Sequence, residues 1–257
     1  MFYDKFHITN REGQRLSCLL FLPHERPNFQ LVVSHGFRGA KENSGRLEVF
    51  ASKVVNQGGS LLAFDFAGSG ESEGQFVDMS LTRQVENLED ITDYSLARSD
   101  SPLILLGRSF GGTTSLVKAS KDSRVRGLVL WSTPVLLQQT FFDHAPQQLE
   151  RLLQGESLKF EDDKGGFLLG TEFGHDIKRH NFAAYLHKIT ERPALVIHGE
   201  KDLDVDLRNV EFIKKHAGDN FTIHVVAGAD HRFTQHLQIR EDLTLKWLEQ
   251  NFGDRHK

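Results

Sequence analysis

Short apolar runs alternate with stretches of helical periodicity along most of this chain. The apolar or β-branched runs predict eight strands, at residues 2–9, 15–22, 30–34, 60–66, 103–106, 125–131, 194–197 and 221–226. The turn signal at residues 10–13 predicts that the first two strands form an antiparallel hairpin. The later strands carry apolar residues on both faces, which is typical of a parallel sheet covered by helices on each side.

Between these strands, apolar residues with helical spacing occur at residues 46–57, 80–94, 206–216 and 233–252 and after Ser109. Ser80 is a suitable N-cap for the second of these helices. Strands that alternate with helices predict an α/β fold: a mostly parallel eight-stranded sheet with helices on both faces. A chain of 257 residues is long enough for one such domain with a full core.

One stretch interrupts this alternation. Residues 135–191 show no clear strand pattern, are rich in phenylalanine and contain an acidic run at 161–163. A plain crossover between strands needs far fewer residues. We therefore expect 135–191 to be a cap inserted over the carboxyl edge of the sheet, and 1–134 with 192–257 to form the core domain. A long helical crossover with a disordered acidic loop is the alternative.

Net charge and composition exclude some classes of binding partner and favour one cellular location. A net charge of −4, a pI near 6.4 and the lack of a basic stripe argue against nucleic acid. The single cysteine, Cys18, cannot form an internal disulfide, which suits a reducing compartment. The N-terminal residues do not resemble a signal peptide, and no apolar run approaches the roughly 20 residues that span a bilayer. We expect a cytoplasmic protein without a membrane span; the sequence leaves open whether it forms a homodimer.

The most informative motif lies at residues 102–112, P-L-I-L-L-G-R-S-F-G-G. An apolar strand runs directly into a Gly-x-Ser-x-Gly turn, and helix-compatible residues follow, as in a nucleophile elbow. Gly107 and Gly111 flank the serine because a side chain there would collide with the neighbouring strand and helix. Ser109 is therefore the candidate nucleophile; a glycine-rich turn without chemistry is the alternative.

A second Gly-x-Ser-x-Gly match, at residues 70–74, lacks this context. It lies several residues after a strand, no helix pattern follows it directly, and two glutamates flank Ser72. We interpret it as a solvated loop.

Two further residues complete a catalytic constellation. A serine hydroxyl needs a base, and that base needs a carboxylate to orient it. Asp202 follows the strand at 194–197, and His231 follows the strand at 221–226. The three residues therefore occur in the order Ser, Asp, His along the chain, which is the order of one known type of catalytic triad. All three residues lie just past the carboxyl end of a strand, where ligand sites of open α/β sheets lie. Ser109, Asp202 and His231 are predicted to form a catalytic triad.

Other residues of the same types fit less well. Asp204 and Asp206 lie near Asp202, but the first turn after the strand reaches the sheet edge best, and Asp206 resembles a helix N-cap. His224 falls within a strand, whereas His216 and His236 fall on helices.

An oxyanion hole needs two backbone N–H groups near the nucleophile. One is expected from Phe110, the residue after the serine, and the other from the loop S-H-G-F-R-G at residues 34–39, where Phe37 is the expected donor. Spacings typical of zinc sites, phosphate loops and dinucleotide sites are absent, so we expect no metal and no cofactor.

Taken as a set, the motifs H-G-F, D-F-A-G-S-G-E-S, G-R-S-F-G-G, H-G-E-K-D and G-A-D-H resemble the α/β-hydrolase fold family over nearly the whole chain. Within that family the chain is similar to small bacterial carboxylesterases of the cinnamoyl and feruloyl esterase type. The resemblance implies Ser109, Asp202 and His231 as the triad and Phe37 and Phe110 at the oxyanion hole. One departure is Arg108, since many relatives carry histidine there.

This resemblance implies a serine carboxylesterase that cleaves small soluble esters, with aromatic hydroxycinnamoyl esters as one candidate class. A monoacylglycerol-lipase-like enzyme and a serine peptidase of the prolyl-oligopeptidase type are alternatives, and residues 161–163 could anchor a substrate amine in the latter. A non-catalytic protein on a hydrolase scaffold fits less well, because such proteins typically lose a triad member.

Overall fold

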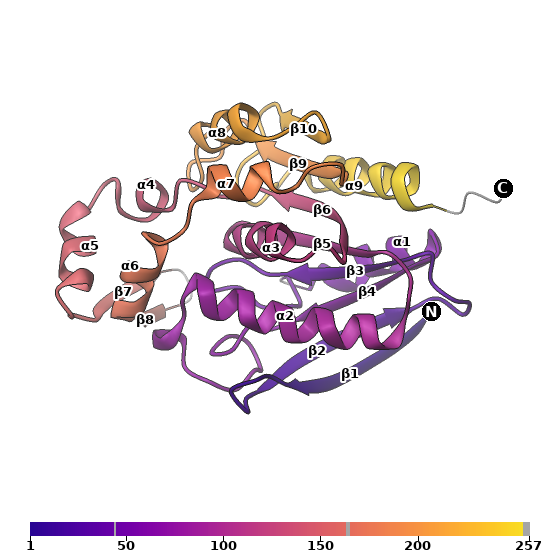
Figure 1. The fold of residues 1–257 in the computed structure, drawn as a ribbon, viewed down its shortest axis with the longest axis horizontal. Coiled ribbons are helices and arrows are strands. Elements are labelled where there is room, and N and C mark those ends of the chain that lie inside the picture. Colours follow the sequence, from indigo (N-terminus) through magenta and orange to yellow (C-terminus); the bar gives the residue numbers. More distant parts are fainter. Residues whose placement is uncertain (44, 163–164, 254–257) are drawn as a thin grey trace.

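The computed structural model describes residues 1–43, 45–162 and 165–253, which form a sheet between two layers of helices (Figure 1). The strand order of the eight-stranded sheet is β1-β2-β4-β3-β5-β6-β9-β10. Its strands are β1 (Phe2–Thr9), β2 (Arg15–Leu22), β3 (Phe29–Ser34), β4 (Gly59–Phe64), β5 (Leu103–Arg108), β6 (Val125–Trp131), β9 (Ala194–Gly199) and β10 (Phe221–Val226).

Within this sheet, only β1–β2 and β2–β4 pair antiparallel; its other neighbouring pairs are parallel. The predicted mostly parallel eight-stranded sheet is confirmed. Because the parallel strands point the same way, the loops after β3, β5, β6 and β9 all leave from one edge, and that edge carries the candidate site.

Two apolar clusters lie on opposite faces of the sheet. Helices α2 (Leu81–Arg98), α3 (Phe110–Lys121) and α8 (Arg208–His216) contribute to one cluster; α1 (Leu47–Asn56) and α9 (Leu237–Phe252) contribute to the other. The predicted cap of α2 is present, since the Ser80 side chain accepts a hydrogen bond from the N–H of Arg83. Each helix layer therefore buries one apolar stripe against a fully apolar sheet face.

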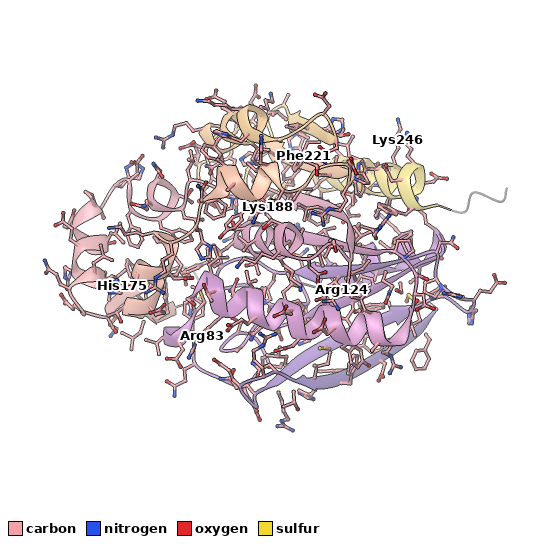
Figure 2. The ribbon with its side chains drawn as sticks, viewed as in Figure 1. Arg83, Arg124, His175, Lys188, Phe221 and Lys246 are labelled. Carbon is pink, nitrogen blue, oxygen red and sulfur yellow. The ribbon has the colours of Figure 1, made fainter. Side chains whose placement is uncertain are left out.

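Charged residues cover the outer surface of these layers. Arg124 in the turn before β6, Lys188 in a later turn and Lys246 on α9 are exposed, and Figure 2 labels all three. Cys18 is fully buried on β2. In the described part of the chain, the search for a helix with the length and apolar character of a membrane span finds none.

The last helix begins later than the sequence pattern predicts. α9 starts at Leu237 rather than at residue 233, because residues 231–236 form turns. Phe233 is fully buried, has a positive φ of 55°, and donates its N–H to the Asp230 carbonyl. The apolar side chain of Phe233 fits the helical pattern in the sequence, which is why the helix was predicted to start there. In the structure this side chain instead anchors the loop that carries His231.

Residues 135–191 contain more regular structure than the sequence pattern suggests. They form α4 (Leu137–Phe142), α5 (Pro146–Leu153), β7 (Leu158–Asp162), β8 (Gly165–Leu169), α6 (Thr171–Ile177) and α7 (Phe182–His187). The β7–β8 hairpin was not predicted, because two five-residue strands interrupted by charges and glycines give little alternation. In Figure 1, α4 to α6 and the hairpin extend beyond one end of the sheet, whereas α7 lies next to α3 and α8.

Candidate active site

The turn between β5 and α3 holds Ser109 in a strained conformation, with φ 52° and ψ −127°. A non-glycine residue adopts a positive φ only where its surroundings force it. Glycines on both sides make the turn possible: a Cβ on Gly107 would overlap the backbone of Gly111, and a Cβ on Gly111 would overlap the backbone of Ser34 and His35. The Ser109 N–H donates to the Trp131 carbonyl (2.7 Å), which ties the turn to the end of β6.

The loop after β9 places Asp202 with both carboxylate oxygens engaged. Oδ1 accepts from the N–H groups of Val205 (2.8 Å) and Asp204 (3.1 Å), and the Asp202 side chain is buried. His198 lies beneath it and donates from Nε2 to the Val205 carbonyl (2.7 Å). Burial lowers the pKa of His198 below its ordinary value, so this imidazole is a neutral donor that holds the loop in shape.

Oδ2 of Asp202 lies 2.8 Å from Nδ1 of His231, which leaves Nε2 of that imidazole as the atom that can take a proton. Backbone packing brings the two loops together, because a Cβ on Gly199 would overlap the carbonyl of Ala229. Ser132 Oγ donates to the carbonyl of His231 (3.2 Å), one residue beyond the Trp131 carbonyl that binds Ser109. The end of β6 thus connects the loops of the predicted nucleophile and base.

The loop after β3 approaches the serine from the other side. A Cβ added to Gly36 would lie 3.1 Å from both the Cβ of Ser109 and the carbonyl oxygen of Arg108. The N–H groups of Phe37 and Phe110 donate to no atom of the described residues. Two free backbone donors beside a candidate nucleophile are what an oxyanion hole requires.

His35 fixes the shape of this loop. Its Nε2 accepts a hydrogen bond from the Phe66 N–H (3.2 Å), so Nδ1 carries the proton and donates to the Gly36 carbonyl (2.8 Å). The N–H of Gly39 donates to the same carbonyl (2.9 Å). With its carbonyl held by two donors, the Gly36–Phe37 peptide keeps its orientation, and the N–H of Phe37 stays available.

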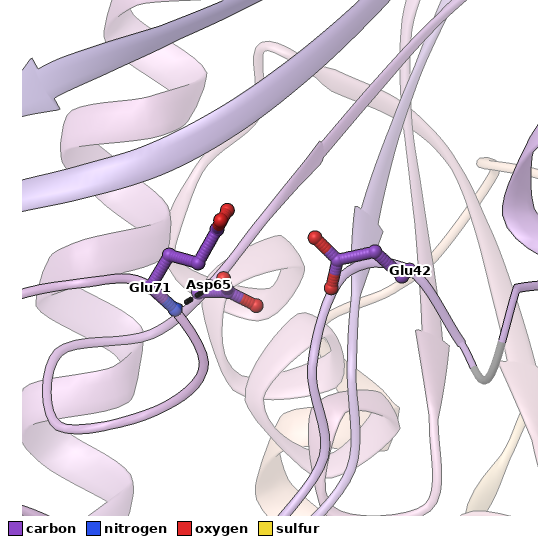
Figure 3. A group of neighbouring side chains, drawn as sticks. All are labelled: Glu42, Asp65 and Glu71. Carbon is purple, nitrogen blue, oxygen red and sulfur yellow. Dashed lines mark hydrogen bonds between the residues drawn. The ribbon is translucent and has the colours of Figure 1, made fainter.

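Behind this loop lies the one group of carboxylates in the described residues whose spacing would suit a metal: Glu42, Asp65 and Glu71, which converge in Figure 3. The Nζ of Lys41 lies between them, 2.7 Å from Glu42, 2.7 Å from Asp65 and 2.6 Å from Glu71. An ammonium group already fills the position that a cation would take. We call these four residues the Lys41 clamp, and its role is to fasten the loop after β3 to the loop after β4.

The interpretation of Ser72 as part of a solvated loop is wrong. This residue is half-buried rather than solvated, and its hydroxyl donates to the Asp65 carbonyl (2.7 Å) while accepting from the Ser17 N–H (2.9 Å). The motif D-F-A-G-S-G-E-S is therefore a structural unit that holds Asp65 in place.

An aromatic cluster surrounds the Phe37 ring. Ring centroids between 5.2 and 6.2 Å away belong to side chains from five different elements: Phe76, Phe110, Phe141, Phe167 and Phe173. Phe110 and Phe173 are fully buried, whereas Phe37, Phe76, Phe141 and Phe167 are half-buried. The buried rings are core packing, and the half-buried ones form an apolar wall next to the oxyanion loop, which we call the aromatic wall.

Arg38 joins this wall to the β7–β8 hairpin. Its guanidinium binds the Asp162 carboxylate (3.0 and 3.1 Å) and the Gly165 carbonyl (3.0 Å), and it stacks 4.5 Å from the Phe167 ring centroid. Asp162, one of the three acidic residues expected to be free for a substrate amine, is therefore already paired. Asp163 lies outside the described residues.

The structure thus pairs Asp202 with His231 and packs the Gly36 loop against Ser109, all in loops that follow strands at one edge of the sheet. Among the described residues, no hydrogen bond joins Ser109 to His231. His35, His198 and Lys41 were not among the predicted site residues; the two histidines hold the shape of their loops, and Lys41 fastens the loop after β3 to the loop after β4. A signal existed for the two histidines, since each lies directly at the end of a predicted strand beside a glycine. Lys41 gave no such signal, because two of its three partners, Asp65 and Glu71, lie in a distant loop.

Residues 25–161 match the family described as serine aminopeptidase, S33. That range includes the Ser109 turn and the loop after β3 but not Asp202 or His231. Mouse monoglyceride lipase is 34% identical over 140 residues, which are 52% of this chain and 45% of the mouse enzyme. The alignment therefore spans less than half the length of that relative.

Solved structures match the whole fold at lower identity. Est1E from Butyrivibrio proteoclasticus with ferulic acid bound superposes with a TM-score of 0.78 at 20% identity, covering 95% of this chain and 98% of Est1E. The α/β hydrolase GrgF from Penicillium sp. sh18 reaches a TM-score of 0.83 at 18% identity, covering 98% and 99%. These likenesses show the α/β-hydrolase fold.

Proposed function

Because this chain belongs to the serine aminopeptidase S33 family and is a hydrolase of the α/β-hydrolase superfamily, we propose that it is a carboxylic ester hydrolase acting through Ser109, Asp202 and His231. The observation that carries the proposal is the 2.8 Å contact between Asp202 Oδ2 and His231 Nδ1, beside a serine held at positive φ. A carboxylate that fixes the imidazole in this way leaves Nε2 to serve as base.

In the proposed reaction, His231 Nε2 takes the Ser109 proton as Oγ attacks the ester carbonyl carbon. The negative charge on the carbonyl oxygen is held by the N–H groups of Phe37 and Phe110. When the tetrahedral intermediate collapses, the C–O bond to the alcohol breaks and His231 gives its proton to the leaving alcohol. Water, deprotonated by the same imidazole, then attacks the acyl carbonyl carbon. The bond from that carbon to Ser109 Oγ breaks, Oγ takes the proton back from His231, and the acid is released.

We infer that the substrates are small esters whose acyl group packs against the aromatic wall. Half-buried Phe37, Phe76, Phe141 and Phe167 offer apolar surface beside the oxyanion donors, which suits a planar or alkyl acyl group. Est1E, whose structure holds ferulic acid, has the same fold and is consistent with aromatic hydroxycinnamoyl esters as one class.

A monoacylglycerol-lipase-like activity is the second candidate. Mouse monoglyceride lipase is 34% identical over 140 residues, and the aromatic wall would also accept an alkyl chain. A peptidase activity is less favoured, because Asp162, a candidate anchor for a substrate amine, is bound to Arg38.

A panel of p-nitrophenyl acetate, butyrate and laurate, methyl ferulate, a monoacylglycerol and an aminoacyl p-nitroanilide tests the proposal. The wild type is expected to cleave esters, and Ser109→Ala is expected to lower kcat by at least about 10⁴-fold. Preference for the short or feruloyl esters supports the esterase, and preference for laurate and the monoacylglycerol favours the lipase. Cleavage of the anilide alone, or full activity of Ser109→Ala, would overturn the proposal.

A further inference from the structure

A cavity of about 470 Å³ lies on the side of Ser109 away from the aromatic wall. It lies between the loop after β3, the end of β5 and the helices α1 and α9. Its walls include Gly36, Asn43, Arg108, Trp131 and Glu241. Gly36 and Arg108 line the cavity and also border Ser109, since a Cβ added to Gly36 would lie 3.7 Å from Ser109 Oγ.

Arg108 is the distinctive side chain of this cavity. It stands at the variable position of the Gly-x-Ser-x-Gly turn, directly before Ser109, and its Nη1 donates to Asn43 Oδ1. Nε is buried and has no hydrogen-bond partner among the described residues. A buried guanidinium N–H without a partner is unfavourable, because it has lost water and gained nothing in exchange.

The neighbouring charged groups do not neutralise the positive charge of Arg108. Burial lowers the pKa of Arg108, and the neighbouring positive charges of Arg232 and Arg46 lower it further. Two carboxylates do line the cavity, but each is paired with a lysine instead: Glu42 with Lys41 (2.7 Å) and Glu241 with Lys53 (2.6 Å).

Resting on the proposed function, we propose that this cavity binds an anionic group of the substrate through Arg108, so that the preferred esters carry a carboxylate or a similar oxyanion close to the scissile bond. A guanidinium presents donors in a planar fork that matches a carboxylate. An anionic group would give Arg108 the counter-charge that no described carboxylate supplies, and Arg108 directly precedes the attacking serine in the chain. Arg108 is then a specificity-determining residue and takes no part in the proton transfers.

The test uses three ethyl esters of equal length: monoethyl adipate (anionic), ethyl hexanoate (neutral) and ethyl 6-aminohexanoate (cationic). A second pair, 4-acetoxybutanoate and pentyl acetate, places the charge on the alcohol. The wild type is expected to favour the anionic ester of at least one set by about 10- to 100-fold in kcat/KM, the range of a hydrogen bond to a charged group. The set that shows the preference identifies the side of the scissile bond that enters the cavity.

Arg108→Gln is expected to abolish this preference, so that kcat/KM for the anionic and neutral esters becomes about equal. Arg108→Glu is expected to reverse it, so that the cationic ester has the highest kcat/KM. Arg124→Gln is the matched control: Arg124 is exposed beyond the opposite end of β6, and its loss is expected to keep the wild-type preference (Figure 2). The ratio between charged and neutral esters is the readout, so a general loss of activity in either Arg108 variant does not imitate the expected result.

Equal kcat/KM for anionic and neutral esters, in a wild type whose activity depends on Ser109, would overturn this inference and leave the esterase proposal intact. That comparison needs no Arg108 variant, so it holds even if neither substitution folds. If the wild type cleaves no ester, calorimetric titration of Ser109→Ala with monoethyl adipate and ethyl hexanoate decides the question by binding alone. Tighter binding of the anion supports the cavity's role, and equal or absent binding overturns it.

Discussion

The two sides of Ser109 differ in the side chains that form them. On one side lies the aromatic wall, in which every ring contacts another ring and the packing itself stabilises the arrangement. On the other side lies the cavity lined by Arg108, whose buried Nε no described residue satisfies. Arg240, buried against Trp131 and Phe233, likewise keeps two nitrogen atoms without a described partner. A region that is complete by itself explains stability, whereas a region with unmet hydrogen-bond demand indicates a ligand. Substitutions on the two sides of Ser109 should therefore differ in their effects.

Gly36 lies between the aromatic wall and the Arg108 cavity, and a side chain at this position should impair the function of both. The Cβ of Gly36→Ala would press on Ser109 Cβ and the Arg108 carbonyl at 3.1 Å and displace the Gly36–Phe37 peptide. Losing one oxyanion donor costs roughly 10²- to 10³-fold in kcat. We expect such a loss for every ester, whatever its charge, with little change in the free energy of unfolding. Steady-state kinetics and urea unfolding measure the two quantities.

Gly166→Ala is the matched control, because its nearest non-neighbouring atom would lie 3.7 Å from the new Cβ. It should retain wild-type kcat. If Gly36→Ala lowers kcat for neutral esters alone or anionic esters alone, the residue does not contact both sides as the structure implies.

On the aromatic side, the cost of removing a ring should follow its burial. Phe173 is fully buried and contacts Phe37, Phe141 and Phe142. Phe173→Ala is therefore expected to lower the free energy of unfolding by about 3 to 5 kcal/mol. Phe167→Ala removes a half-buried ring from the substrate-facing wall, and it should cost less stability while raising KM for aromatic esters. Chemical denaturation and KM measurements separate them; an equal loss of stability would mean that both rings are core.

Sequence reasoning predicted the sheet because the information for it is local. Runs such as 103–106 are apolar throughout and bounded by glycine or proline, so both their type and their position are determined by neighbouring residues. The β7–β8 hairpin was missed for the converse reason. It is held by contacts from outside, such as the binding of Arg38 to Asp162, and its own five-residue strands carry little pattern.

The candidate triad could be predicted because strand ends of a parallel sheet meet at one edge, whatever lies between them in sequence. The Arg108 cavity could not. Arg108 is visible in the motif, but its missing partners depend on how Glu42 and Glu241 pair with lysines, and those pairings exist only in the folded chain. The tautomer of His35 likewise depends on the Phe66 N–H, 31 residues away.

On the polar side, removing a charge should not destabilise the fold. Arg240 is almost fully buried between Trp131 and Phe233, at 4.1 and 5.1 Å from their ring centroids, and its Nε and Nη1 lack described partners. Burial lowers its pKa below the ordinary value. We expect Arg240→Met to leave the free energy of unfolding unchanged or to raise it by about 1 kcal/mol, because the methionine avoids the desolvation cost. A loss above about 2 kcal/mol in urea unfolding would show that the guanidinium is satisfied in solution.

The smallest effect concerns the Lys41 clamp and depends on pH. Hydrogen bonds from Lys41 and Lys5 lower the pKa of the exposed Glu71 from its ordinary 4.5 to about 2. A depressed carboxyl pKa contributes stability above the unfolded-state pKa and loses it as the pH falls toward the folded-state pKa. The stability difference between wild type and Glu71→Gln should therefore be constant above a pH of about 5 and shrink between 4.5 and 2. Glu25→Gln, at an exposed position without an ion pair to any described residue, should show no such window. Thermal unfolding across this pH range measures both variants, and a Glu71 difference that stays constant down to pH 2 would mean that the clamp holds without this carboxylate's charge.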